Sequence, residues 1–118
     1  MSSKRLNRMG EELKKAVSLI ILNEIKDPRI SPVTSVTHVD LTRDLRYAKM
    51  YISVMGNEKE KEETIEGLNS AKSFIRREMG QRVKMRYTPE PIFELDESLD
   101  EGLKINSILR SLDEKNNK

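Results

Sequence analysis

The sequence of 118 residues contains no cysteine, no tryptophan and a single histidine. Without cysteine the chain has neither a disulfide framework nor a thiolate metal site, and nothing in it marks an oxidising compartment. The longest apolar run, Leu19 to Leu22, is far too short for a membrane span or the core of a signal peptide. These absences favour a cytoplasmic protein with no membrane partner.

Aromatic residues are also scarce, at 4% of the chain, whereas hydrophobic and charged residues each make up 36%. Aliphatic side chains and methionine must therefore fill the core. The length is that of one domain, and no internal repeat or long linker separates a second one. We expect one domain over residues 1–112, followed by a flexible polar tail over 113–118.

A helix is expected over residues 3–26, where apolar residues recur at spacings of three and four. Pro28 disfavours helical geometry at the residue before it, so the helix should end at or just before Lys26. The first turn carries cations and no acid. It is a candidate part of a basic surface, although a solvated helix face would explain the same charges. These cations are Lys4, Arg5 and Arg8.

Two strands are expected over residues 33–42 and 46–55, joined by a turn into an antiparallel hairpin with one buried face. His38 should be exposed or at an edge, because the chain offers no other His or Cys to share a metal. Tyr47 and Tyr51 lie in phase on the face away from the core. They could stack on bases, or they could simply pack on lysine stems.

A broken helix is expected after the hairpin. Asn57 and Glu60 form a capping-box pattern at its start, and Gly80 is placed to end it as a left-handed C-cap. Small residues weaken its middle. They predict two helices that meet at a bend within Ser70 to Ser73, with one slightly curved helix as the alternative.

A third strand is expected over residues 81–96, where the pattern alternates throughout. Pro89 and Pro91 remove hydrogen-bond donors, so the distal half should lie on a sheet edge or leave the sheet there, and the basic half should be better formed. Ser98 begins another capping-box pattern, followed by a short last helix up to Leu112. The residues expected to point inward are Val83, Met85, Tyr87, Phe93 and Leu95, and those expected to point outward are Arg82, Lys84 and Arg86.

A right-handed crossover would place the third strand beside the second and parallel to it. The sequence thus predicts an α+β domain of order αββααβ plus a short C-terminal helix, with a three-stranded mixed sheet and helices on one face. This is the order of a type II KH domain, in which RNA is held against the turn between the two crossover helices.

Charge is distributed unevenly along the chain. Residues 67–88 carry six cations and one acid, whereas the charged residues of 89–102 are all acids. RNA binding requires cations at phosphate spacing, and alternate residues of a strand lie about 7 Å apart. We predict an RNA-binding surface here, with an ordinary solvated face as the alternative. Its candidate residues are Lys72, Arg76, Arg77, Arg82, Lys84 and Arg86, extended by Lys4, Arg5 and Arg8.

One acidic run is the only constellation that an enzyme could use, as a magnesium site or as a paired general acid and base. Carboxylates at a helix start explain the same residues. The sequence has no phosphate-cradling glycine loop and no nucleophile with its base. We expect no enzyme activity, no cofactor, no metal and no small-molecule substrate. The run comprises Glu94, Asp96, Glu97, Asp100 and Glu101.

Several blocks, taken in order, make residues 4–112 resemble the bacterial ribosome-binding factor A family. The blocks are KDPRI at 26–30, DLRYAKMYISV at 44–54, AKSFIRREMGQRVKMR at 71–86, TPE at 88–90 and FELDESLDEGLKI at 93–105.

The resemblance implies a KH-like monomer that binds the small ribosomal subunit (30S) and its 16S rRNA during late maturation. It further implies help with folding and processing of the 5′ end of that rRNA, and importance for growth in the cold. In the family an Ala-x-Gly kink replaces the KH loop. This pattern falls on Ala71, Lys72 and Ser73, and the kink residues expected from it and from the bend are Ser70, Ala71 and Ser73. Ser73 lacks the φ freedom of the family glycine, although its hydroxyl can bond a backbone carbonyl.

Two function classes remain open. The first is an RNA-directed assembly factor on the small subunit, and the second is a KH-like protein-interaction module that docks another factor without direct RNA contact. Steep salt dependence and protection of naked rRNA would favour the first. Binding that survives nuclease treatment of the partner would favour the second.

Overall fold

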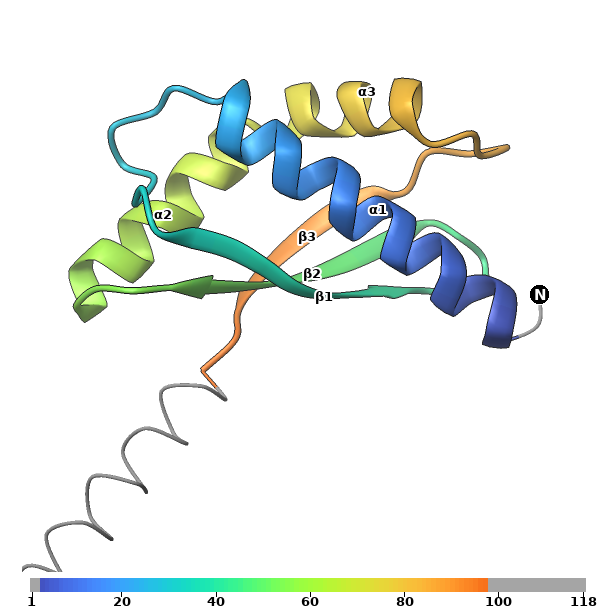
Figure 1. The fold of residues 1–118 in the computed structure, drawn as a ribbon, viewed down its shortest axis with the longest axis horizontal. Helices are drawn as coiled ribbons and strands as arrows, with labels where there is room; N and C mark the ends of the chain where they lie inside the picture. Colours follow the sequence, from blue (N-terminus) through green and yellow to red (C-terminus); the bar gives the residue numbers. More distant parts are fainter. Residues whose placement is uncertain (1–2, 98–118) are drawn as a thin grey trace, which may run out of the picture.

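Three helices cover one face of a three-stranded sheet (Figure 1). The structure, a computed structural model, describes residues 3–97. Among these residues, no helix covers the opposite face of the sheet. The predicted order αββααβ is confirmed. The elements are α1 (Ser3–Asn23), β1 (Thr34–Leu41), β2 (Tyr47–Val54), α2 (Glu58–Ser70), α3 (Lys72–Arg82) and β3 (Glu90–Leu95). The expected last helix and the tail lie outside the described residues.

The sheet has the strand order β1-β2-β3. As predicted, β1 pairs with β2 antiparallel and β3 pairs with β2 in parallel. Met50 lies at the centre of the sheet, opposite Val39 on β1 and Phe93 on β3. An irregularity between Val36 and His38 shifts the register of β1.

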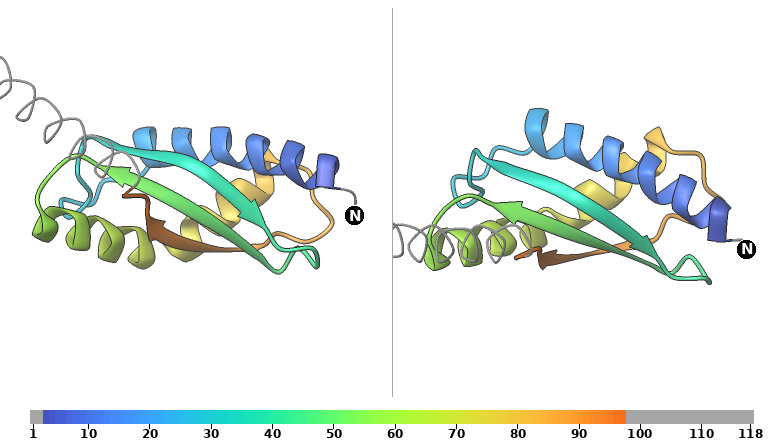
Figure 2. Two further views of the ribbon diagram at one scale, coloured as in Figure 1. Left: turned by 90° about the horizontal axis from the view of Figure 1, so that it is seen from below. Right: turned by 60° about the horizontal axis from the view of Figure 1, so that its bottom comes forward.

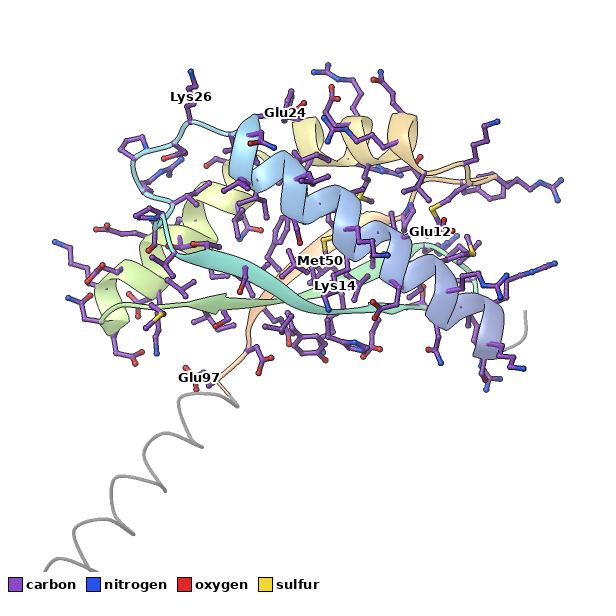
Figure 3. The ribbon with its side chains drawn as sticks, in the orientation of Figure 1. Glu12, Lys14, Glu24, Lys26, Met50 and Glu97 are labelled. Carbon is purple, nitrogen blue, oxygen red and sulfur yellow. The ribbon has the colours of Figure 1, made fainter. Side chains whose placement is uncertain are left out.

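Alternation along β2 places the core on one face of the sheet, because successive side chains of a strand point to opposite faces. Its residues Ala48, Met50 and Ile52 are fully buried. Figure 3 shows Met50 beneath α1, between that helix and the sheet. The helices complete this core with apolar side chains of α1, α2 and α3, among them Leu13, Val17, Ile20, Leu68, Ile75 and Met79, each with 0% exposure.

Two glycines allow the helices to lie close to their neighbours. A Cβ on Gly10 of α1 would meet the carbonyl oxygen of Val39 at 2.8 Å, so glycine sets the distance between α1 and β1. A Cβ on Gly67 of α2 would meet Cγ1 of Ile30 at 2.7 Å. The loop that contains Ile30 is also held by buried Thr64, whose Oγ1 accepts a hydrogen bond from the amide of Ser31 at 3.1 Å.

The predicted third strand is wrong in its basic half. Helix α3 does not stop at Gly80 but continues to Arg82, and the amide of Val83 still donates to the carbonyl of Met79 at 2.9 Å. Gly80 has no positive φ. Its hydrogen side faces Thr88, because a Cβ there would lie 2.6 Å from the Thr88 hydroxyl oxygen. The strand begins only at Glu90, beyond an irregular segment over residues 83–89.

Other boundaries shift for local reasons. Helix α1 ends at Asn23, before the predicted limit of Lys26, and a turn at Glu24 follows. Tyr87, expected to point inward, is 64% exposed because it belongs to the irregular segment and not to a strand. Pro91 does lie on an edge strand, as predicted. Within residues 3–97, no helix combines the length and apolar character that crossing a membrane requires.

Candidate nucleic-acid interface

The break between α2 and α3 falls at Ala71, inside the stretch where the sequence predicts a bend. Ala71 has φ −93° and ψ 6°, and its amide donates to the carbonyls of Gly67 and Leu68, both at 3.1 Å. Its own carbonyl accepts from the amide of Ile75 at 2.9 Å, which begins the hydrogen bonding of α3. One residue thus ends one helix and starts the next, and the two helices run in different directions (Figure 1).

Ser73 is compatible with this break, because Ala71 is the one residue between the two helices and Ser73 already belongs to α3. Ser73 lies in the first turn of α3 and is exposed. The non-glycine residue with positive φ in the described chain is Leu45, which is in the β1–β2 turn. The freedom of glycine is therefore not required at position 73.

A shallow pocket of about 280 Å³ lies where the end of α1 meets the break. Ala71, Ile25 and Phe74 give it apolar walls, and Glu24 and Asp27 contribute carboxylates. Those acids already have partners inside the domain. The guanidinium of Arg29 bonds both oxygens of Asp27 at 3.1 and 2.7 Å and, with its backbone amide, lowers the pKa of that carboxyl. Glu24 is bound by Arg82. The lining residues are Glu24, Ile25, Lys26, Asp27, Ser70, Ala71 and Phe74.

The cations of α3 line a second hollow, of about 510 Å³, together with Ser73, Gly80 and Thr88. Arg76 donates from Nε and Nη2 to the carbonyl oxygen of Thr88, at 3.2 and 3.0 Å. The guanidinium of Arg77 lies 5.6 Å from the centre of the Phe74 ring. Both arginines are exposed. This hollow therefore presents positive charge directly beside the helix break.

Two other predicted RNA-binding cations have acidic partners within the domain. The ammonium of Lys72 lies 3.9 Å from Oε1 of Glu90, at the start of β3. Arg82 is paired with Glu24 at the end of α1. Each pair is partly exposed, so it contributes little stability, but it reduces the positive charge available to a partner.

Lys84 and Arg86 are not on a strand, so the regular spacing of about 7 Å expected for them does not exist. Both belong to the irregular segment between α3 and β3, and both are exposed. The guanidinium of Arg86 lies 5.9 Å from the centre of the exposed Tyr87 ring. The structure thus places these two cations on a loop, away from the sheet hydrogen bonds.

Lys4, Arg5 and Arg8 lie in the first turns of α1 and line a small hollow of about 280 Å³ with Met9 and Glu12. All three cations are exposed. In Figure 1 and in both views of Figure 2 this start of α1 lies at the same end of the domain as the β1–β2 turn and the segment before β3.

Two further cations, Arg43 and Arg46, are not among the residues predicted from the sequence. Both lie in the β1–β2 turn and are exposed. The amide of Glu90 donates to the carbonyl of Arg46 at 2.8 Å, which joins this turn to the segment that carries Lys84 and Arg86. A signal was present in the sequence, since two arginines flank a two-residue turn, but only the fold brings them to the other cations.

On the uncovered face of the sheet, Tyr51 packs on neighbouring side chains. The Tyr51 ring stacks on His38 with a centroid distance of 6.0 Å, and the ammonium of Lys49 lies 5.6 Å from the Tyr51 centroid. Glu94 binds Lys49 at 3.3 Å and raises its pKa. Tyr47 is 41% exposed. His38 is exposed and bonded to Asp40, so its expected exposed position is confirmed.

Two acids of the acidic run, Asp96 and Glu94, have partners within the fold. Oδ2 of Asp96 accepts a hydrogen bond from the Thr37 hydroxyl at 2.6 Å, and Glu94 binds Lys49. Within residues 3–97, the His, Asp and Glu side chains form no group of three or more that could hold a metal ion. Asp100 and Glu101 lie outside the described residues.

Comparison with known proteins places this fold in a family. The model of the family described as Ribosome-binding factor A matches residues 5–109. The chain belongs to the ribosome-binding factor A family. It is 58% identical over 108 residues to ribosome-binding factor A of Caldanaerobacter subterraneus subsp. tengcongensis, covering 92% of this chain and 88% of that one. It is 54% identical over 114 residues to that of Clostridium botulinum (strain Loch Maree / Type A3), covering 97% and 95%.

Solved structures of ribosome-binding factor A proteins have the same fold. A solution structure from Thermotoga maritima, described as a putative ribosome binding factor A, matches with a TM-score of 0.70 and 30% identity over 80% of this chain and 89% of that one. The crystal structure of the Thermus thermophilus protein gives a TM-score of 0.68 at 24% identity over 76% and 94%, a likeness of fold alone.

A further match is a homology model of the Thermus thermophilus ribosome binding factor A, fitted into a cryo-electron microscopy map of a 30S complex. Its TM-score is 0.65 at 23% identity, over 78% of this chain and 96% of that one. In this member of the ribosome-binding factor A family, the helix break and its neighbouring cations therefore occur on the fold that the relatives share.

Proposed function

We propose that this chain binds the small ribosomal subunit through its 16S rRNA and acts as an assembly factor late in maturation. In this role it assists the folding and processing of the rRNA 5′ end, and it is needed most at low temperature. The domain over residues 1–112 is the RNA-binding unit and acts as a KH-like monomer. It binds and shapes RNA without catalysis, cofactor or metal.

Membership of the ribosome-binding factor A family supports this function. The match covers residues 5–109, which includes every cation that we assign to the interface except Lys4. A relative from Thermus thermophilus has been fitted into a map of a 30S complex. The named family and that complex make the small subunit the partner to test first.

The observation that carries the proposal is the placement of Arg77 and Arg76 beside the break at Ala71. The break changes the direction of the surface between the two helices, and the adjacent hollow of α3 is lined by arginine. Positive side chains around a concave surface attract the phosphates of a folded RNA, and the shape of that surface selects which RNA fits.

Cosedimentation with purified precursor and mature small subunits, across a salt series, tests the binding. The variant Arg77→Gln with Lys72→Gln removes two cations at the surface of α3 and leaves the Arg76 contact intact. The matched control Lys15→Gln with Lys59→Gln also removes two exposed cations, from the middle of α1 and from the acidic start of α2.

The interface variant should lose affinity and show a smaller salt slope, while the control should bind like the wild type. Equal affinity of both variants for the subunit would show that the α3 surface does not contribute to binding. Binding that survives digestion of the subunit rRNA would instead identify a protein-docking module, and this outcome would contradict direct RNA contact.

A cellular test addresses the maturation step. In cells depleted of the protein, primer extension should show small-subunit rRNA with unprocessed 5′ ends, and the growth defect should deepen on cooling. The interface variant should fail to restore processing, whereas the lysine control should restore it. Normal 5′ ends in depleted cells, at low temperature as well, would contradict the assembly role.

A further inference from the structure

We propose that one end of the domain is a second RNA-contact surface, separate from the helix break, which binds the phosphate backbone through arginines of the β1–β2 turn. This inference rests on the proposed function and extends it to a second place on the molecule. We call this region the end surface. It consists of Lys4, Arg5, Arg8, Arg43, Arg46, Lys84 and Arg86.

The fold brings three separate segments to this end. Helix α1 runs back along β1 at close range, as the 2.8 Å approach of a Gly10 Cβ to the Val39 carbonyl shows, so the start of α1 lies near the end of β1. The Glu90 amide bonds the Arg46 carbonyl at 2.8 Å and brings in the segment before β3. All views in Figures 1 and 2 show the three segments at one end.

The turn that carries Arg43 and Arg46 is held by other groups. The Thr42 amide donates to the Tyr47 carbonyl at 3.0 Å, and the Leu45 amide donates to the Thr42 carbonyl at 2.9 Å. Oδ1 of Asp44 accepts from the Thr42 hydroxyl at 2.7 Å and from the backbone amide of Arg46 at 3.0 Å. These contacts fix the backbone of the turn and leave both guanidinium groups at the exposed surface.

Acidic residues around the end surface are few and are mostly engaged. Asp40 bonds His38 at 2.8 Å, and Glu90 pairs with Lys72. Asp44 holds the turn, and Glu12 borders the hollow at the start of α1. Seven cations on three short segments therefore produce a local positive field, which the net charge of +2 for the whole chain conceals.

The composition of the end surface fits a phosphate backbone better than an acidic protein. Protein interfaces have an apolar centre, which is depleted of charge. Of the large apolar side chains exposed in residues 3–97, Tyr87 lies on one of these three segments and Tyr47 directly follows Arg46. Tyr87 is the more exposed of the two, at 64%. It lies beside Arg86, where its ring could stack on an unpaired base. Separated arginines with little apolar surface between them are suited to binding a nucleic acid, because its phosphate charges repeat along the backbone.

The salt dependence of binding to purified small subunits tests this surface. The variant Arg43→Gln with Arg46→Gln should reduce the slope of log K against log salt by about 1.4 to 1.8, if each arginine neutralises one phosphate. This corresponds to binding that is about 25- to 60-fold weaker at about 0.1 M salt. The control Lys15→Gln with Lys59→Gln removes the same charge and should keep the wild-type slope.

A photo-crosslinking residue at position 43 in the otherwise unchanged chain gives an independent reading that does not require a charge variant to fold. A crosslink to 16S rRNA supports the inference, whereas a crosslink to a ribosomal protein overturns it. An unchanged affinity and salt slope for the Arg43→Gln, Arg46→Gln variant would also overturn the inference. In that case the binding of the wild-type protein to small subunits would still support the proposed function. If the wild type itself does not bind small subunits, the proposed function fails first.

Discussion

Arg76 of α3 donates two hydrogen bonds to a single acceptor, the carbonyl oxygen of Thr88, from Nε at 3.2 Å and from Nη2 at 3.0 Å. The Thr88 side chain, in turn, lies against the bare Cα of Gly80. Helix α3 thus holds the segment that leads into β3 from two positions one helical turn apart. An arginine that the sequence assigns to RNA binding therefore also has a structural contact.

Replacing Arg76 should accordingly affect stability. In the variant Arg76→Gln, the guanidinium group that donates both hydrogen bonds to Thr88 is absent. We expect a loss of about 1 kcal/mol in the free energy of unfolding, which is modest because the contact is exposed. Urea denaturation measures this loss. Arg77→Gln, at the next position, should cost less. Equal costs for both variants would show that the bonds to Thr88 contribute no stability.

Leu45 should reverse the usual ranking of alanine and glycine. Its φ of 60° is unfavourable for any residue with a Cβ, and its side chain is 9% exposed. Leu45→Ala loses the buried side chain and keeps the strained backbone, whereas Leu45→Gly loses the same burial but relieves a strain of about 1 kcal/mol. We expect the glycine variant to melt at the higher temperature of the two. Calorimetry on both variants checks the order, and a more stable alanine variant would contradict it.

Ser73 should tolerate alanine better than glycine. It occupies the first turn of α3, two residues after the helix break at Ala71. Ser73→Gly should cost about 0.5 kcal/mol through the greater freedom of the unfolded chain, and Ser73→Ala should be neutral or slightly stabilising. Denaturant unfolding measures both. A stabilising glycine would mean that serine strains the bend.

Asp44 should make the domain sensitive to acid. The Thr42 hydroxyl, followed by the Arg46 amide, lowers the pKa of its carboxyl below the ordinary 3.8. Because the folded pKa is depressed, the stability that this group contributes is present above about pH 4 and is lost as the pH falls through the folded pKa. Asp44→Asn keeps an acceptor oxygen but does not titrate.

The melting temperature of the Asp44→Asn variant should therefore fall less than that of the wild type between about pH 5 and about pH 2.5. Asp40→Asn is a suitable comparison, because Asp40 is an exposed acid on the neighbouring strand. Parallel acid profiles for the wild type and Asp44→Asn would show that the turn does not depend on the charge.

Local signals in the sequence were sufficient for much of the fold. Asn57 accepts from the amide of Glu60 at 2.8 Å, and the Glu60 side chain accepts from the Asn57 amide at 3.3 Å, so the capping box forms as its spacing predicts. Alternation in β2 predicts its buried face, since both features depend on neighbours along the chain. The crossover rule then gives the parallel pairing of β3.

The stretch after Gly80 could not be assigned in the same way. Its alternating pattern is short enough to fit the end of a helix or a strand, and contacts distant in sequence decide between them. Thr88 against Gly80, and Arg76 against the Thr88 carbonyl, position the chain so that β3 begins late. The position of Arg43 near the other cations likewise could not be predicted locally, because it depends on the packing of the hairpin end beside the start of α1.

Pro91 limits the growth of the sheet. Because the Glu90 amide faces β2, the backbone of the next residue faces the outer edge, where proline has no N–H to offer. Pro91 is the second residue of this six-residue edge strand, so an incoming strand would meet a missing donor near its start. The proline thereby disfavours the pairing of a further strand at this edge, and this backbone effect does not depend on the charge of the surface.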